Sequence, residues 1–348
     1  MKKIAFILAT ILAIACQREY PDVIRIEGGK LHVQGIALDQ KENCMYCSFT
    51  SAFFKTDLEG NITGSVTGIN GHLGAMTFDS KNRKVYASLE IKDDAIGKGI
   101  AKALGAAEHK KEESGFYIAE IAVDKITGLD MKFEDIITLH RVEEAVKDYL
   151  AKVEIDGQVL DHKYGCSGID GITIGPAFGT VQGEADHLYV AYGVYGDTTR
   201  VDNDYNILLC YNLKDLSKPI HKYFVFTGNT RYGVQNMAFD KDSWSLYLAV
   251  YKGSKKQYPN HSMFAIKMSQ KPFMAPLMGV PYQEGEVEQL SVNDAWHFKW
   301  GSTGLCPLGD GRWYFSENSK IDGNQICDAR MYVITDNEEE PFTPYSKN

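Results

Sequence analysis

The sequence predicts an all-β chain folded as a five-bladed β-propeller. Five stretches repeat one pattern, in which a short apolar strand, a polar turn and a second strand follow one another. The second strand carries a tyrosine each time, and a small residue, Ser or Ala, stands two positions later. The composition agrees, because 32 glycines and 20 tyrosines suit many short strands joined by tight turns. The stretches are 34–49, 74–89, 170–192, 235–250 and 303–317, with Tyr46, Tyr86, Tyr189, Tyr247 and Tyr314.

The strands that follow each pair complete the predicted blades. Third strands are expected at 52–57, 115–123, 206–213, 262–268 and 330–335, and fourth strands at 62–66, 135–140, 222–227 and 286–291. This leaves the fifth blade one strand short. We expect residues 23–27 to supply the missing strand, because an N-terminal strand in the last blade closes the ring and removes a free sheet edge.

One long segment, 92–163, interrupts the repeat, and it leaves a sixth, divergent blade as an alternative. Its first part, about 92–114, is rich in Gly, Ala and Lys, and we interpret it as an insertion on blade two. Its last part, about 141–163, contains apolar residues at helical spacing, which predicts an inserted helix. These residues are Val142, Ala145, Val146, Tyr149 and Leu150. Residues 23–340 are therefore expected to form a single propeller domain.

The N-terminus has the pattern of an export signal. Lys2 and Lys3 precede a short apolar run, and small residues end it, which predicts a signal peptide over residues 1–15. The next residue is Cys16, so the leader resembles that of a bacterial lipoprotein, although Ala13 replaces the usual leucine. The resemblance implies lipidation of Cys16, a tether over 16–22 and a place in the bacterial cell envelope, on the periplasmic or the outer-membrane face. Ordinary cleavage after Ala15 is the alternative.

The charge and the cysteines exclude some classes of partner. The net charge is −9, which argues against a nucleic-acid binder. No later segment is apolar over the ~20 residues that a membrane span requires, so the lipid anchor is the expected membrane contact. The chain is also expected to be a monomer. Cys44 and Cys47 form a lone C-x-x-C, which on a strand places the two thiols on opposite faces and predicts structural cysteines rather than a zinc site. The six cysteines after Cys16 also permit disulfides.

The repeat carries a family resemblance. The phrase TDLEGNITG at 56–64, taken with the blade pattern, resembles the strand–turn–strand edges of propeller proteins of the NHL, SMP-30 and calcium-apyrase kinds. The resemblance covers nearly the whole mature chain. It implies the propeller fold and a ligand-binding face, and it supplies no family-specific catalytic motif.

The starts of the innermost strands are expected to meet at one rim of the central channel. Aligning the repeats brings polar and aromatic residues to this rim, which suits a site for a small molecule or glycan. The candidate ligand-binding residues are His72, Asp170, Arg231, Tyr232, Gln235, Trp300 and Thr303, with His32 in the same alignment column as His72. Asp170 is the candidate catalytic residue, since it is the one carboxylate in its column. The alternative is that such residues satisfy backbone groups and water in the channel.

Acidic loops between second and third strands suggest a metal. They contain Asp93 and Asp94, then Asp197, Asp202 and Asp204, then Asp322 and Asp328. Oxygen ligands of this kind suit Ca²⁺, and the candidate ligands of a Ca²⁺ site are Glu90, Asp170 and Glu317. Solvated acidic loops are the alternative.

The stretch YGCSGIDGITIGP, 164–176, contains two potential nucleophiles, Cys166 and Ser167. It does not match G-x-S-x-G, and the repeat places it at the start of an inner strand with no visible base. Two function classes therefore stay open. The chain binds a small molecule, such as a sugar, without turnover, or it is a Ca²⁺-dependent hydrolase or lyase of the lactonase, glycosidase or polysaccharide-lyase type.

Overall fold

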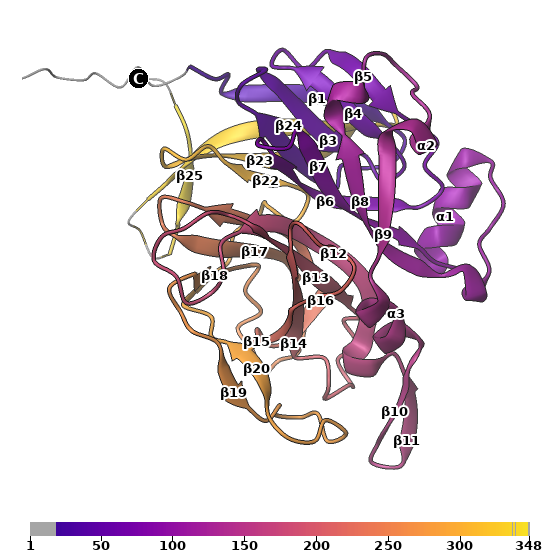
Figure 1. Cartoon of the computed structure of the whole chain (residues 1–348), viewed down its shortest axis with the longest axis vertical. Coiled ribbons are helices and arrows are strands. Elements are labelled where there is room, and N and C mark those ends of the chain that lie inside the picture. Colours follow the sequence, from indigo (N-terminus) through magenta and orange to yellow (C-terminus); the bar gives the residue numbers. More distant parts are fainter. Residues whose placement is uncertain (1–18, 336, 338, 347–348) are drawn as a thin grey trace, which may run out of the picture.

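A computed structural model describes residues 19–335, 337 and 339–346, and it confirms the five-bladed propeller (Figure 1). The innermost strands of the five sheets contact one another in a closed ring, since β2 lies against β6, β6 against β12, β12 against β16, β16 against β22, and β22 against β2. Segment 92–163 contains helices and a small hairpin beside the strands of blade two, and no sixth blade, in the described chain.

Blades one and two are four-stranded antiparallel sheets, as predicted. Blade one consists of β2 (Gly35–Asp39), β3 (Cys44–Ser48), β4 (Phe53–Asp57) and β5 (Ile62–Val66). Blade two consists of β6 (His72–Asp79), β7 (Lys84–Ile91), β8 (Gly115–Ala122) and β9 (Ile137–Arg141).

Blades three and four differ from the prediction in their outer strands. Residues 286–291 were expected as the fourth strand of blade four, but β20 pairs in parallel with β15 of blade three. The long connection after β18 allows this crossing, and a three-residue strand, β21, takes the outer place in blade four. Blade three consists of β12 (Cys166–Gly175), β13 (His187–Val194), β14 (Tyr205–Asn212), β15 (His221–Phe226), β20 (Val287–Leu290) and β19 (Phe273–Ala275). Blade four consists of β16 (Thr230–Asp240), β17 (Ser245–Lys252), β18 (Met263–Lys267) and β21 (Asp294–Trp296).

The predicted closing strand is present in blade five. β1 pairs antiparallel with β24, and its inward residues Ile24 and Ile26 have no exposed surface. On the outer side of β1, Arg25 forms an ion pair with Asp328 over 2.7 Å. Blade five consists of β1 (Val23–Gly29), β22 (Leu305–Pro307), β23 (Arg312–Ile321), β24 (Asn324–Ile334) and β25 (Phe342–Pro344).

The repeated residues have structural roles that explain the pattern. The inner strands of blades one, two and four end in an aspartate that accepts hydrogen bonds from the turn that follows, as Asp39 does from the amides of Lys41 and Glu42. In blades one and two the small residue of the second strand is a serine that bonds to the neighbouring blade. Ser48 donates to the carbonyl oxygen of Gly74 over 2.7 Å, and Ser88 donates to that of Asp170 over 2.6 Å. The repeated Asp residues therefore stabilise turns, and the repeated Ser residues of blades one and two form contacts between blades.

The insertions are helical and lie at the edge of the ring, where Figure 1 shows α1 and the hairpin β10–β11 projecting outward. The predicted helix exists as α3, and four of its expected apolar residues are buried, whereas Leu150 is 52% exposed. The helices are α1 (Ala95–Leu104), α2 (Phe133–Ile136) and α3 (Glu143–Leu150), with 3₁₀ turns at Lys111–Glu113, Val123–Lys125 and Lys163–Gly165. The hairpin is β10 (Lys152–Ile155) with β11 (Gln158–Asp161).

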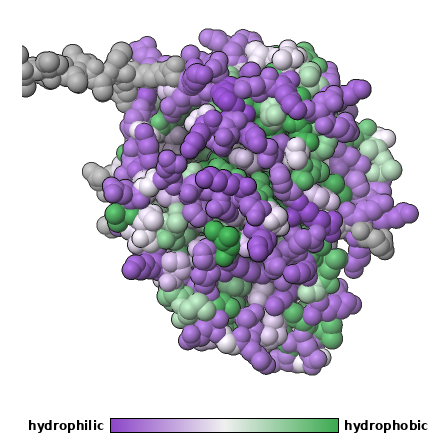
Figure 2. Space-filling view, in the orientation of Figure 1, coloured by the Kyte–Doolittle hydropathy of each residue, from purple (hydrophilic) through white to green (hydrophobic). Residues whose placement is uncertain are grey.

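The core lies between the sheets, and the face in Figure 2 is mainly hydrophilic with small separate apolar groups. Cys44 and Cys47 face different core clusters, as expected for opposite faces of β3, and the cysteines of the described chain are all free. No described helix is both long and apolar enough to span a bilayer. The predicted signal peptide and Cys16 lie outside the described residues.

Candidate functional site

A cavity of about 340 Å³ opens at one end of the central channel. Its polar walls come from the first two strands of blades one to four and the loops beside them, and they include Gln34, His72, Glu90, Asp170 and Gln235. Helix α1 adds an apolar wall through Ile96 and Ile100. The rim that the repeat alignment predicts is therefore a real concave surface.

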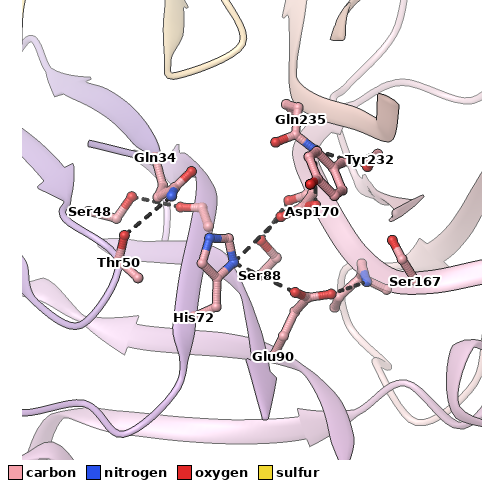
Figure 3. A network of polar contacts seen from close by, with 12 residues as sticks. Gln34, Ser48, Thr50, His72, Ser88, Glu90, Ser167, Asp170, Tyr232 and Gln235 are labelled. Carbon is pink, nitrogen blue, oxygen red and sulfur yellow. Dashed lines mark hydrogen bonds and ion pairs between the residues drawn. The ribbon is translucent and has the colours of Figure 1, made fainter. Parts of the chain in front are cut away.

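His72 lies between two carboxylates at the base of this cavity (Figure 3). Its Nδ1 atom is 3.7 Å from an oxygen of Glu90 and 3.7 Å from an oxygen of Asp170. These distances are too long for hydrogen bonds, and the buried Nδ1 has no hydrogen-bond partner. Ligand atoms of the three residues all lie within 4.8 Å of one another.

The blade geometry positions all three side chains. His72 begins β6 and is directly opposite Glu90 on β7. Asp170 is on β12 of the next blade, where Ser88 holds its backbone oxygen and Gln235 donates to its carboxylate over 3.0 Å. Glu90 crosses toward blade three and accepts a hydrogen bond from the amide of Ile169 over 2.8 Å. The three groups are therefore held by strands rather than by loops.

Lys92 is a buried cation beside this cluster. Its Nζ lies 2.8 Å from Glu90 and 3.5 Å from Asp94, and it donates to the carbonyl oxygen of Ser167 over 2.9 Å. The Lys92 side chain is 5% exposed and that of Glu90 is 3% exposed. Asp94 also caps the first turn of α1 through the amides of Ile96 and Gly97. Lys92 thereby links the cluster to the helix that forms the apolar wall.

Burial controls the protonation of the cluster. It lowers the pKa of His72 to about 3, with the Lys92 charge acting in the same direction, so the imidazole is neutral at pH 7. Burial, with the charge of Glu90, raises the pKa of Asp170 well above its usual range, and burial also raises the pKa of Glu90. Burial alone would lower the pKa of Lys92, but the charges of Glu90 and Asp94 outweigh it and raise that pKa. A neutral imidazole therefore lies beside two carboxyl groups whose pKa values are raised.

The strand β16 carries a strained residue at the cavity wall. Tyr232 has φ +66°, in the left-handed region that non-glycine residues rarely adopt, and a β-bulge lies between Arg231 and Val234. The amide of Gln235 donates both to the backbone oxygen of Tyr232 and to Asp170. One side chain therefore fixes the strained turn and the carboxylate together.

The structure separates the predicted site residues into two groups. His32, His72, Asp170, Tyr232 and Gln235 line the cavity, and Arg231 lines two outer cavities beside it. Whether they bind a ligand stays a prediction.

Three other predicted site residues do not line the cavity. Trp300 packs beside the blade-five core with Lys299 over its ring, and Thr303 donates its hydroxyl to the backbone oxygen of Ser316. Glu317 was expected near the channel axis, but it forms an ion pair with Arg330 and accepts a hydrogen bond from Tyr332. The reason is that β23 and β24 continue as one long hairpin, so the expected acidic loop of blade five is a strand pair that turns at Asp322.

The acidic loop of blade three is likewise occupied by side chains of the protein. Asp202 pairs with Arg200 over 2.8 Å, and Asp204 pairs with the buried Lys255 over 2.5 Å. These carboxylates hold the loop together and do not face the cavity.

The stretch YGCSGIDG contributes backbone groups to the site, and its Ser167 and Asp170 line the cavity, whereas Cys166 does not. Cys166 is fully buried, and burial raises the pKa of its thiol, which keeps the sulfur in the protonated, poorly nucleophilic form. Gly168 has φ +127°, and a side chain at that position would overlap the Glu90 carboxylate. The glycine therefore lets blade three approach Glu90 closely, and Asp170 is the carboxylate that this stretch brings to the cavity.

Lys92 and the apolar wall of α1 were not predicted, nor were the cavity tyrosines Tyr195 and Tyr251. Lys92 could have been found from the spacing of Glu90, Lys92 and Asp94, because alternate residues of a strand share a face. The apolar wall of α1 carries no such signal, since only the fold brings this helix to the cavity.

The similarity of the chain to known proteins is distant. No protein-family model and no curated protein sequence matches the chain. A luciferin-regenerating enzyme of known structure is 13% identical, with a TM-score of 0.38 over 88% of this chain and 95% of that enzyme. The GH43_1 enzyme from Xanthomonas citri, solved with xylose, is 10% identical, with a TM-score of 0.45 over 92% of this chain and 93% of its own. At these values neither neighbour supports an argument about activity.

Proposed function

We propose that the chain binds a divalent metal ion through His72, Glu90 and Asp170, and that this centre binds and hydrolyses a small polar molecule in the adjoining cavity. The observation that carries the proposal is the Nδ1 atom of His72, which is buried without a hydrogen-bond partner between two carboxylates. A neutral imidazole can offer a lone pair there. Ligands about 2.0–2.2 Å from one ion lie about 3–4 Å apart, which fits the two 3.7 Å separations.

The charge of the cavity also favours a cation. Its lining contains three carboxyl groups, Glu90, Asp94 and Asp170, and one cationic side chain, Lys92. Full ionisation leaves three minus one, or two, negative charges in a largely buried space. Either protons or a divalent cation can balance them. A divalent ion would balance both charges and also satisfy the imidazole.

The donor set indicates the class of metal. Ca²⁺ prefers six to eight oxygen ligands, whereas an imidazole nitrogen with two carboxylates suits Zn²⁺ or Mn²⁺. The replacement of Glu317 by His72 in the set therefore shifts the expectation from Ca²⁺ to these ions. Three protein ligands leave positions open for water and substrate, and bound water of lowered pKa is the usual nucleophile of metal-dependent hydrolysis.

Metal binding is tested by isothermal titration of the mature chain, freed of metal with EDTA, against Zn²⁺, Mn²⁺ and Ca²⁺ in separate runs. We expect Zn²⁺ or Mn²⁺ to bind at one site, and His72→Ala and Asp170→Asn to remove that binding. His140→Ala is the matched control, because His140 also lies beside a carboxylate, 3.2 Å from Glu120, but on the outer strand β9. Failure of all three ions to bind would refute the proposal.

Hydrolysis is tested separately, with a panel of lactones, aryl esters and aryl glycosides. We expect turnover of at least one class only in the presence of the metal, and Asp170→Asn to abolish it. Turnover that EDTA leaves unchanged would remove the metal from the reaction.

A second candidate is metal-free binding of a glycan, which three tyrosines in the cavity wall favour. Tyr195, Tyr232 and Tyr251 can stack on a sugar ring, while Gln34 and Gln235 can hydrogen-bond its hydroxyls. Sugar binding that survives EDTA, without turnover, would support this candidate over the metal centre.

We further propose, from the leader sequence, that the mature chain is exported and anchored through lipidated Cys16. Cys16→Ser should release the chain from the bacterial membrane fraction. A chain that fractionates with membranes in both forms would contradict the anchor.

A further inference from the structure

A second, outer cavity of about 760 Å³ adjoins the proposed metal centre. His32, Tyr232 and Tyr251 line both this cavity and the inner one, so the two spaces share a wall. The outer cavity therefore lies within reach of a molecule whose other end contacts His72.

The outer cavity is lined by positive residues although the chain as a whole is acidic. Arg231 and Lys252 line it, none of its lining residues is acidic, and the whole chain has a net charge of −9. Neither cation forms an ion pair within the described part of the chain. The inner cavity has the opposite composition, with three carboxyl groups and one ammonium group.

A buried donor without a partner lies in the same wall. Asn229 is 1% exposed, and its side-chain oxygen accepts a hydrogen bond from the amide of Ser254 over 3.2 Å. Its Nδ2 has no partner in the structure. A buried donor is costly when it is left unpaired, which indicates an acceptor supplied from outside the protein.

The backbone holds Arg231 at the junction of the cavities. It lines both the 760 Å³ cavity and a neighbouring one of 550 Å³. The strained Tyr232 follows it directly, and Gln235 ties the backbone of Tyr232 to Asp170. Strain of this kind persists where the surrounding structure enforces it, and it clusters at functional sites.

We infer that the outer cavity binds an anionic oxygen group, a carboxylate or a phosphate, of the small molecule whose other end reaches His72. The span across both cavities rests on the proposed function, whereas anion binding at Arg231 and Lys252 does not. The substrate class is then an organic acid or a phosphorylated compound. A guanidinium fork binds either group through two hydrogen bonds, and Lys252 and Asn229 supply further donors.

The test is titration calorimetry with three probes, namely inorganic phosphate, gluconate and neutral glucose. We expect at least one anion to bind and glucose to bind more weakly than either, and we expect added KCl to weaken anion binding. Arg231→Gln and Lys252→Gln should each weaken it about tenfold, because a hydrogen bond to a charged group is typically worth that much. Lys320→Gln is the matched control for lost charge, since Lys320 is an exposed residue of the blade-five hairpin.

The possible results separate this inference from the proposed function. Binding of one anion alone supports the site and identifies the group. Absence of binding for both anions, or equal binding by the wild type and both cavity variants, overturns the inference. Zn²⁺ or Mn²⁺ titration of Arg231→Gln should give unchanged affinity, and His72→Ala should still bind the anion. The metal centre can therefore fail without the anion site failing, and the reverse is also true.

Discussion

Replacing the buried lysine of the site, Lys92→Met, should lower the stability of the metal-free protein and increase its response to metal. The ammonium lies 2.8 Å from Glu90, and both side chains are at most 5% exposed. Methionine keeps most of the side-chain length and removes the charge. Glu90 then keeps only its hydrogen bond from Ile169, and the carbonyl oxygen of Ser167 loses its lysine donor.

The expected loss follows from the burial of the pair. Two unit charges 2.8 Å apart attract by roughly 6 kcal/mol at an effective dielectric constant of about 20. Desolvation of both groups offsets much of this attraction, and removal of one partner from a buried pair typically costs about 3–5 kcal/mol. Since Glu90 can take up a proton in response, we expect a loss near the lower end, about 3 kcal/mol.

The assay is urea unfolding at pH 7, followed by tryptophan fluorescence, with EDTA or with excess Zn²⁺ or Mn²⁺. Saturation at about 100 times Kd should stabilise the wild type by about 2.7 kcal/mol. The variant should gain more, because no ammonium competes for Glu90. Lys255→Met is the control, since Lys255 is also buried and pairs with Asp204 over 2.5 Å in a separate network. It should lose a similar stability and gain nothing extra from metal. An equal metal effect in both variants would refute the reasoning.

Three further predictions concern the ligands, the thiol and the ring closure. Metal affinity should rise with pH, because burial raises the pKa values of Glu90 and Asp170 and each carboxyl must lose its proton to bind the metal. Calorimetry at several pH values measures this, and a constant affinity would contradict it. Cys166→Ala should leave metal binding and any turnover unchanged. Loss of turnover in a variant that folds normally by circular dichroism would support Cys166 as a nucleophile instead. Ile26→Ala should cost about 2–5 kcal/mol in urea unfolding, and Arg25→Ala on the same strand should cost less, since only the isoleucine is fully buried. Equal losses would argue against packing as the source of closure.

The fold was largely predictable because the repeat reflects strand pairs and turns that recur around the ring, with hydrogen bonds that several blades share. The turn-capping aspartates and the small residues between blades are visible in one sequence. The outer strands were less predictable, since β21 has three residues and gives no periodic signal. Residues 286–291 have strand character, but their partner depends on where a long connection runs, and it runs to blade three.

The part of the candidate site that lies on the inner strands could be predicted, because the repeat aligns these strands. Aligning the inner strands placed His72, Asp170 and Gln235 at the cavity. It failed for Glu317, because a polar stretch resembles a loop although Asp322-Gly323 is a strong hairpin-turn signal. Contacts between blades two and three, such as Glu90 with Ile169, depend on side-chain reach across the ring, which no local pattern encodes.

The strand that closes the ring also constrains the order of folding. Arg25 and Asp328 are 303 positions apart in the chain, so blade five cannot be completed until nearly all of the polypeptide has been synthesised. Until then β1 has no partner strand and the hydrophobic surface of blade one that faces blade five is uncovered, which slows folding and favours association with other chains. A ribosome-bound or translocating chain would therefore rely on chaperones until its last strands emerge, and truncation after blade four should yield an aggregating product rather than a smaller propeller.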